Sequence, residues 1–311
     1  MIEKVEYRGW KNNLRIANAT TELIVTLDVG PRVIAYRKPG GFNVMKNYDE
    51  MMGGINEKEW QIRGGLRFWI APEDLTRTYC PDNSPVTHTQ LSDCSARFTP
   101  PVEAEYGIQK VMELRLEESG SRVHVRLIVT NMGQTATTLA PWAPTVMAPG
   151  GMEIIPLPPK ANHPGHPSRA KHPGDFGPNQ KLILWPYFDF TDDRWTFGSR
   201  YIFLKQNVKK GPTKIGLGHP VPWVAYWNAG TLFVKRFRHH EWAEYPDTGT
   251  SYQTFTNEDM LEMETVGALC NLLPGQSAQL EETWELFSDV PEIMSEADAG
   301  KLNTLLGSEA N

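Results

Sequence analysis

The chain has 311 residues, a formal net charge of −6 and 40% hydrophobic residues, including 10 Trp, 10 Tyr and 12 Phe. This composition supports a folded core and excludes an intrinsically disordered chain. The acidic balance and the lack of a long Lys/Arg run argue against nucleic acid and anionic membranes as partners.

The N-terminal stretch and the cysteines bear on the cellular compartment of the protein. The N-terminal stretch "MIEKVEYRGWKNNLRIAN" mixes acids with apolar residues where an export signal needs an unbroken apolar run, and no segment reaches the roughly 20 apolar residues that span a bilayer. Cys80, Cys94 and Cys270 are odd in number and lack metal-ligand spacing, which is typical of free thiols in a reducing compartment. We therefore expect a soluble cytoplasmic protein.

Short alternating or β-branched runs recur along the chain, and each is bounded by Gly, Pro, Asn or Asp, as strands joined by turns are. In chain order they read "TELIVTLDVG", "RVIAYRK", "VMELRLEES", "RVHVRLIVTN", "YIFLKQN", "TLFVKRF", "SYQTFTN", "LEMETVG" and "QLEETWELF". The segment "LEESGSRVHVRLIVTN" predicts a hairpin that turns at Ser119-Gly120-Ser121. Only the tail "VPEIMSEADAGKLNTLL" has helical spacing. We predict a mostly β fold with little helix.

Residues 141–180 interrupt this pattern because they are rich in proline and glycine, and they hold His163, His166 and His172. Long segments of this kind are often binding loops or lids. We favour an ordered loop over one face of the protein rather than a disordered insertion. Prolines after the first two histidines disfavour a chelating helix, so we expect no metal there. No linker divides the chain, and we expect one domain over residues 1–311.

The stretch "WQIRGGLRFWIAPED", residues 60–74, combines two glycines with arginines and aromatic residues. Arginine supplies a planar fork of donors, and tryptophan supplies a flat apolar face, which together can hold a sugar. Arg63, Arg67 and Trp69 are therefore candidate substrate-binding residues. A glycine bulge with a surface arginine is the alternative interpretation.

The stretch "LFVKRFRHHEWAEYPDTG", residues 232–249, places Lys235 in a row of aromatic residues if it is a strand. Neighbouring histidines on a strand point to opposite faces, so His239 and His240 make a poor metal-binding pair. Tyr245 and Asp247 are candidate ligand contacts, although Asp247 before Thr-Gly is first of all a turn signal.

Two acids separated by one residue stand in "FTNEDMLEMETVGALC". In a strand, Glu262 and Glu264 share one face and Met263 points to the other. Enclosed on one face, two carboxylates repel, and the pKa of one of them rises into the range useful for acid and base catalysis. A solvated strand face is the alternative.

These motifs resemble the galactose mutarotase (aldose 1-epimerase) superfamily. "IRGGLRFWIAPED" is similar to the "RGG" segment of its hexose-6-phosphate epimerase branch, and "LEMETVG" resembles the strand that carries its catalytic base, which falls on Glu264. "VRLIVTNMGQTATTL" resembles the strand and turn before its catalytic histidine. The resemblance is closer still to an uncharacterised bacterial branch with "GG-x-R-x-W-x-x-PE" and "E-x-E-T-x-G" patterns. It implies a large antiparallel β-sandwich with a concave ligand-binding face.

The chain departs from that superfamily where the acid histidine is expected, because it reads "LAPWAPTVMAPGG" with Trp142 and no histidine. We count Trp142 among the substrate-binding candidates. Lys235, Tyr245, His219 and the histidines of residues 141–180 are the candidate proton donors. Arg67 and Lys235 are expected to hold Glu264 ionised, with Glu262 in a supporting role.

The expected function is therefore anomer interconversion by an aldose 1-epimerase-type isomerase, without a cofactor or metal. The expected ligand is a small carbohydrate, with acidic and phosphorylated sugars included. A non-catalytic sugar-binding or sensing domain is one alternative, and a lyase or epimerase acting on acidic sugars is another. The sequence does not indicate the oligomeric state.

Overall fold

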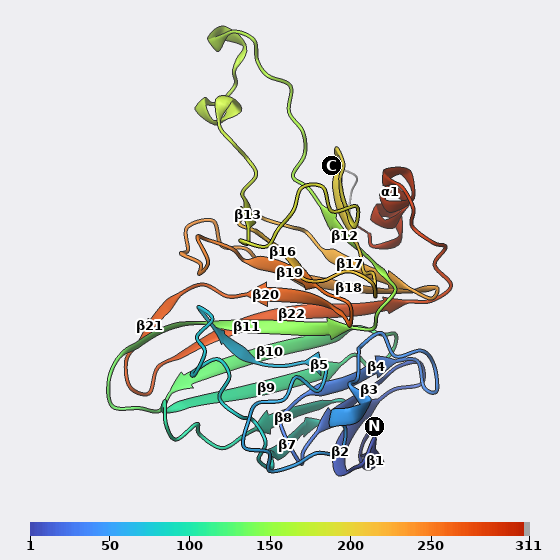
Figure 1. Cartoon of the computed structure of the whole chain (residues 1–311), viewed down its shortest axis with the longest axis vertical. Helices are drawn as coiled ribbons and strands as arrows, with labels where there is room; N and C mark the ends of the chain where they lie inside the picture. Colours follow the sequence, from blue (N-terminus) through green and yellow to red (C-terminus); the bar gives the residue numbers. More distant parts are fainter. Residues whose placement is uncertain (308–311) are drawn as a thin grey trace.

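The computed structural model describes residues 1–307 and contains two large antiparallel β-sheets packed face to face, with one α-helix in this range (Figure 1). The predicted mostly β fold and the β-sandwich implied by the resemblance are confirmed. Each of the nine runs singled out in the sequence contains a strand. The hairpin prediction is also correct, because the strands on either side of Ser119-Gly120-Ser121 pair along their length.

The first sheet has twelve strands. Ten follow the order β1 (Ile2–Tyr7), β2 (Trp10–Ala17), β3 (Glu22–Thr26), β4 (Val33–Arg37), β5 (Gly65–Leu66), β11 (Thr137–Met147), β20 (Leu261–Val266), β19 (Tyr252–Thr256), β16 (Thr213–Leu217) and β13 (Leu182–Leu184). The other two, β6 (Trp69–Ala71) and β21 (Cys270–Leu272), also pair with β11. Strand β11 is therefore the hub of this sheet.

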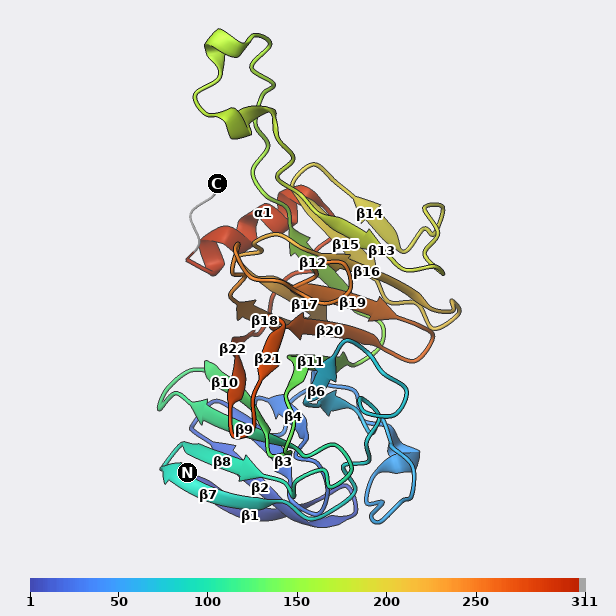
Figure 2. The same cartoon turned by 90° about the vertical axis from the view of Figure 1, so that its left-hand side faces the viewer.

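The second sheet has ten strands. Their order is β14 (Trp195–Phe197), β15 (Tyr201–Lys205), β12 (Met152–Pro156), β17 (Val224–Asn228), β18 (Thr231–Phe237), β22 (Ser277–Phe287), β10 (Val123–Asn131), β9 (Ile108–Leu116), β8 (Ser95–Thr99) and β7 (Thr87–Ser92). Figures 1 and 2 show that the two sheets run alongside each other, so β1 and β7 lie at one end and β13 and β14 at the other.

The main core lies between the sheets and joins residues that alternate inward from both. Tyr36 on β4 illustrates the contact, because its ring centroid lies 6.0 Å from that of Phe233 and 5.8 Å from that of Trp284 on the opposite sheet. All three side chains are buried. This packing fixes which face of each strand points away from the core and is free to build a site.

The irregular segment is shorter than the sequence predicted. Strands β11 and β12 take up residues as far as Pro156, so the loop without strands covers residues 157–181 and not 141–180. Two of the prolines that suggested a loop, Pro141 and Pro144, lie within β11, where Pro144 is beside the break between β5 and β6 and needs no amide donor for the sheet. The remaining loop extends away from both sheets instead of lying over one face (Figure 1).

The predicted C-terminal helix is confirmed as α1 (Glu296–Leu305). Its N-cap Ser295 accepts a hydrogen bond from the Asp298 amide, which satisfies a donor that the first turn leaves free. Leu302 packs with Ile293 against the outer face of the second sheet. Three short 3-10 turns complete the helical content of the described chain: η1 (Asp49–Met51), η2 (Pro167–Arg169) and η3 (Pro173–Phe176). Over residues 1–307, no helix has the length and apolar character needed to cross a membrane.

Candidate active site

Strand β20 carries both acids of the "LEMETVG" motif and pairs with β11 on one side and β19 on the other. Its alternation sends Leu261 and Met263 into the core between the sheets, and it sends Glu262 and Glu264 to the opposite, outer face. Both acids are buried on that face, so other side chains cover them. The solvated strand face is thus excluded.

Glu264 is held between a lysine and a tryptophan. The Nζ atom of Lys214 on β16 lies 2.9 Å from one carboxylate oxygen of Glu264 and 3.1 Å from the other. The indole Nε1 of Trp142 donates a hydrogen bond of 3.1 Å to the same carboxylate. The ammonium group of Lys214 also stacks over the rings of Trp142 and Trp185, at 5.1 Å and 4.9 Å from their centroids.

Glu262 has its own cation. The Nη1 atom of Arg67 donates a 2.5 Å hydrogen bond to the Glu262 carboxylate, and both side chains are buried. The guanidinium carbon of Arg67 lies 3.8 Å from the centroid of the Trp69 ring and 5.5 Å from that of Trp60. The sequence separates Arg67 from Glu262 by 195 positions, yet the sheet brings them together because β5 and β20 both pair with β11.

Aromatic rings line one side of these two ion pairs. Trp69 lies at the centre, with ring centroids 4.9 Å from Trp60, 4.9 Å from Tyr79 and 5.2 Å from Trp142. Such faces match the apolar C–H side of a sugar ring, and the neighbouring charges match its hydroxyl groups. The predicted binding residues Arg67, Trp69 and Trp142 are therefore brought together with both acids.

The electrostatics of the site favour a carboxyl group that titrates near neutral pH. Burial raises the pKa of Glu264 to about 7, Lys214 opposes that rise, and the neighbouring Glu262 adds to it. Burial and the nearby Glu264 carboxylate also raise the pKa of Tyr187, which keeps its phenol protonated. Cations do favour the ionised form of Glu264, as the sequence predicted for Arg67, and Lys214 is the larger of them, but burial is the largest influence on this pKa and acts in the opposite direction.

Two buried polar atoms beside the site have no hydrogen-bond partner in the part of the chain that the structure describes: Nε of Arg67 and Oε1 of Gln253. Gln253 lies directly across from Glu264 in the pairing of β19 with β20. Its Nε2 donates a 2.6 Å hydrogen bond to Asp247, so Asp247 reaches the site through Gln253. A free donor and a free acceptor on buried side chains can be satisfied by the hydroxyl groups of a ligand.

Arg63 lies apart from this group, in contrast to the sequence interpretation. It has a positive φ of 53°, and its side chain turns into the loop before β5. There it donates hydrogen bonds of 2.7 Å to Glu57, 2.9 Å to Asn83 and 3.0 Å to the carbonyl of Met51. These contacts make Arg63 an internal support of the loop.

Lys235 is also placed elsewhere, because the core-facing side of β18 carries it between the two sheets. Its Nζ lies 3.2 Å from Glu282 and donates to Thr145 Oγ1 at 2.8 Å and to the carbonyl oxygen of Met263 at 3.0 Å. The alternation in the sequence predicted that Lys235 has aromatic neighbours. It did not predict that Lys235 reaches β20 from the core side, opposite to the face that carries Glu262 and Glu264. The cation in contact with Glu264 is Lys214 instead.

The other candidate proton donors have different partners. Tyr245 accepts a hydrogen bond from the His240 amide and stacks on His239 at 5.0 Å. His219 is buried beside the backbone of Lys181. The histidines of the long loop are exposed and bond within that loop, as with His166 and Ser168. Within residues 1–307, the side-chain hydrogen bonds to the Glu264 carboxylate come from Trp142 and Lys214, and from none of these candidates.

Sequence reasoning missed Lys214 and Gln253. Each interrupts an apolar or β-branched run, in "TKIGL" and "YQTFT", and both are buried in strands. A buried lysine in a strand requires a partner, which is the signal that identifies Lys214. In the described part of the chain, no three His, Cys, Asp or Glu side chains are grouped to hold a metal ion.

Comparison with known proteins supports the fold. No family model matches the chain, and no curated protein matches it in sequence. A galactose mutarotase-like protein from Lactobacillus casei ATCC 334 superimposes with a TM-score of 0.60 at 11% identity, covering 89% of this chain and 100% of that one. A candidate aldose 1-epimerase from Escherichia coli K12 has a TM-score of 0.53 at 10% identity, covering 88% and 98%.

A longer protein contains the same fold. A TPR-domain containing protein from Parabacteroides distasonis ATCC 8503 has a TM-score of 0.59 at 15% identity, covering 90% of this chain and 48% of that one, so the present chain spans about half its length. The chain therefore has a galactose mutarotase-like fold.

Proposed function

We propose that this chain is a carbohydrate-active enzyme that interconverts the anomers of an aldose by general acid and base catalysis. The observation that carries the proposal is the enclosed Glu264, which contacts Lys214 and Trp142 on the outer face of β20. A base whose pKa is about 7 is suited to proton transfer near neutral pH.

In the proposed reaction, Glu264 accepts the proton of the anomeric hydroxyl group while Lys214 donates a proton to the ring oxygen. The bond between the anomeric carbon and the ring oxygen breaks, and the open-chain aldehyde turns about its first carbon–carbon bond. The reverse transfers then close the ring with either configuration. Lys214 thereby takes the part of the acid histidine that the resembling family uses and this chain lacks.

The remaining site residues would bind the sugar. Arg67 Nε and Gln253 Oε1 offer a free donor and a free acceptor for hydroxyl groups, and Trp69 offers an aromatic face. Both cations of the site are already paired with carboxylates, Arg67 with Glu262 and Lys214 with Glu264. We therefore expect an uncharged aldose to bind better than a phosphorylated or uronic sugar.

Saturation-transfer NMR of anomer exchange tests the proposal with a panel of neutral, phosphorylated, amino and uronic sugars. We expect accelerated exchange for at least one neutral aldose at catalytic protein concentration. Rates that equal the buffer rate for the whole panel would reject it. Deuterium that enters a carbon position from deuterated water would instead support an epimerase or lyase acting on acidic sugars.

A non-catalytic sugar-binding domain is the second candidate, and one observation favours it. In this structure both acids are occupied by ion pairs, as they would be in a rigid recognition site. A thermal shift with a sugar that shows no accelerated exchange would support this second function.

A further inference from the structure

The loop of residues 157–181 forms an arm that projects from the body of the protein (Figures 1 and 2). Its side-chain hydrogen bonds up to residue 180 stay within the arm, such as those from the amides of Lys171 and His172 to Asp175. One aromatic contact, His163 with Phe176 at 5.5 Å, is its main apolar packing. No residue from 158 to 180 belongs to a hydrophobic cluster of the described chain.

An ordered arm without packing is costly. Fixing a residue in one backbone conformation costs roughly 1 kcal/mol or more, and few contacts of the arm offset this cost. Its six prolines lower the cost because they stiffen the chain in extended form. A proline-rich extended segment gains most by lying against a surface lined with aromatic rings.

The same end of the molecule carries such an aromatic surface. Phe188 is its centre, with ring centroids 4.9 Å from Phe190 and 6.3 Å from Phe197, and Phe197 stacks on Trp195 at 5.8 Å. Phe190 is 75% exposed and Phe197 is 43% exposed, whereas Phe188 is partly buried and Trp195 is buried in the main core. We call these four residues the aromatic patch. Exposed apolar groups gathered in this way are typical of protein interfaces.

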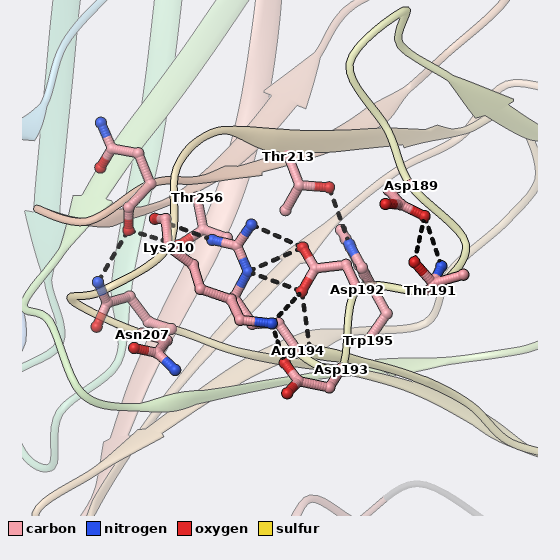
Figure 3. A network of polar contacts seen from close by, with 12 residues as sticks. Asp189, Thr191, Asp192, Asp193, Arg194, Trp195, Asn207, Lys210, Thr213 and Thr256 are labelled. Atoms are coloured by element: carbon pink, nitrogen blue, oxygen red, sulfur yellow. Dashed lines mark hydrogen bonds and ion pairs between the residues drawn. The ribbon is translucent and has the colours of Figure 1, made fainter.

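The patch is preformed because a polar network fixes the loop that carries it, as Figure 3 shows. Arg194 donates hydrogen bonds of 2.7 Å and 3.0 Å to Asp192, and the Trp195 indole donates one of 3.0 Å to Thr213. Asp189 accepts from the amide and hydroxyl of Thr191 at 2.7 Å and 2.8 Å. The exposed rings are therefore held in place, which lowers the entropy cost of binding a partner.

Two further features of the patch suit an arm from another molecule: the sign of its charge and its position at the edges of both sheets. Residues 157–181 carry four basic side chains against one acid, whereas residues 187–194 carry three aspartates and one arginine. Asp192 pairs with Arg194 and Lys210, and Asp193 pairs with Lys210, so Asp189 is the aspartate of this segment without an ion pair within the described residues. The patch lies where β13 and β14 form the outer strands of their sheets, each paired on one side only. Such edges invite contact with another chain.

We propose that the arm of one copy of this protein docks on the aromatic patch of a second copy, and that the exchange is reciprocal. The arm extends away from the two sheets of its own chain. At its base, the outgoing and returning segments are joined by a 3.2 Å hydrogen bond from the Asn179 side chain to the Pro159 carbonyl. Arm and patch lie at the same end of the molecule, so one two-fold axis satisfies both contacts. This assembly is independent of the proposed catalytic reaction.

Sedimentation velocity of the full chain over a concentration series tests the proposal. We expect a dimer for the parent, and a monomer when a short Gly-Ser connection replaces residues 160–178. This replacement suits the structure because Pro159 and Asn179 are already in contact. We expect Phe190→Ser to raise the dimer dissociation constant by about tenfold or more. Leu91→Ser, an exposed leucine on β7 at the opposite end, is the matched control and should not change it.

Mixing separates arm exchange from other dimers. The arm-shortened chain keeps its patch and the Phe190→Ser chain keeps its arm, so together they should form a heterodimer with one arm and patch contact. A parent that stays monomeric at every concentration overturns the proposal. A dimer that both variants leave unchanged also overturns it, because the interface then lies elsewhere.

Discussion

Lys214 and Glu264 form a buried ion pair on the outer face of the first sheet, with Nζ 2.9 Å and 3.1 Å from the two carboxylate oxygens. Strand β19 lies between their strands, and Gln253 on it faces the same side. The pair therefore spans three neighbouring strands, β16, β19 and β20. Trp142 on β11 donates a further hydrogen bond to the Glu264 carboxylate. This arrangement unites an acid, a base and an aromatic face within one small area.

Glu264→Gln should remove the base and preserve the shape of the site. We expect anomer exchange to fall by about a hundredfold or more, while the variant keeps its fold and part of its sugar affinity. Exchange rates and thermal melting of the same samples measure this. Glu281→Gln, an exposed acid of the second sheet, is the matched control and should be silent. Unchanged turnover in Glu264→Gln would remove Glu264 from the mechanism.

Lys214→Met should affect both rate and pH dependence. Because Lys214 opposes the rise in the pKa of Glu264, its loss moves that pKa further upward from about 7. The rising limb of the pH–rate profile should therefore move to higher pH, and the maximal rate should fall. Lys214→Arg keeps the positive charge and should restore the position of the limb. A profile that stays in place in Lys214→Met would show that the lysine does not act on Glu264.

Local sequence patterns predicted the strands well but not their neighbours. Alternation in "LEMETVG" correctly assigned the two acids to one face, since a strand fixes side-chain direction every second residue. The partners of these acids come from the order of strands in the sheet. Lys214 lies 50 positions from Glu264, and Arg67 lies 195 positions from Glu262. No local pattern specifies that β16, β19, β20 and β11 are neighbours.

Lys235 and Arg63 also show that a local sequence pattern does not specify the partners of a side chain. Alternation predicted that Lys235 lies among aromatic residues, yet it could not tell the core between two sheets from an outer binding face. For Arg63, the positive φ next to two glycines redirects the side chain into a loop, which a motif of residue types does not reveal. Both residues are hydrogen-bond donors, as their side chains suggest, but each donates to protein groups inside the fold.

Glu153 should make the stability of the protein depend on pH. This carboxyl group lies between the sheets, accepts hydrogen bonds from the hydroxyls of Tyr252 and Thr254, and burial raises its pKa from 4.5 to about 7. The folded state thus keeps a proton that the unfolded chain loses, so this contribution is full below pH 4.5 and is lost as pH rises through 7. It is on the order of 3 kcal/mol.

Glu153→Gln should reduce the change in the free energy of unfolding between pH 4.5 and pH 8. The amide has the shape of the protonated acid and does not ionise, so the variant should gain stability relative to the parent at pH 8 and little at pH 4.5. Urea unfolding at a series of pH values measures the difference, with Glu281→Gln again as the control for a surface carboxylate. An equal difference between variant and parent at pH 5 and pH 8 would contradict a titrating Glu153.

The Arg67 and Glu262 pair lends itself to a double-mutant cycle, because removal of one charge leaves the other buried without a partner. We expect Arg67→Met and Glu262→Leu each to lower the free energy of unfolding by about 3–5 kcal/mol, whereas the double variant should recover much of that loss. Chemical unfolding gives the four stabilities. Sugar affinity, measured by calorimetry on the same proteins, should remain weak in the stable double variant because the hydroxyl-binding donors of Arg67 are gone. A double variant that is stable and binds the sugar as the parent does would show that this ion pair serves the fold alone.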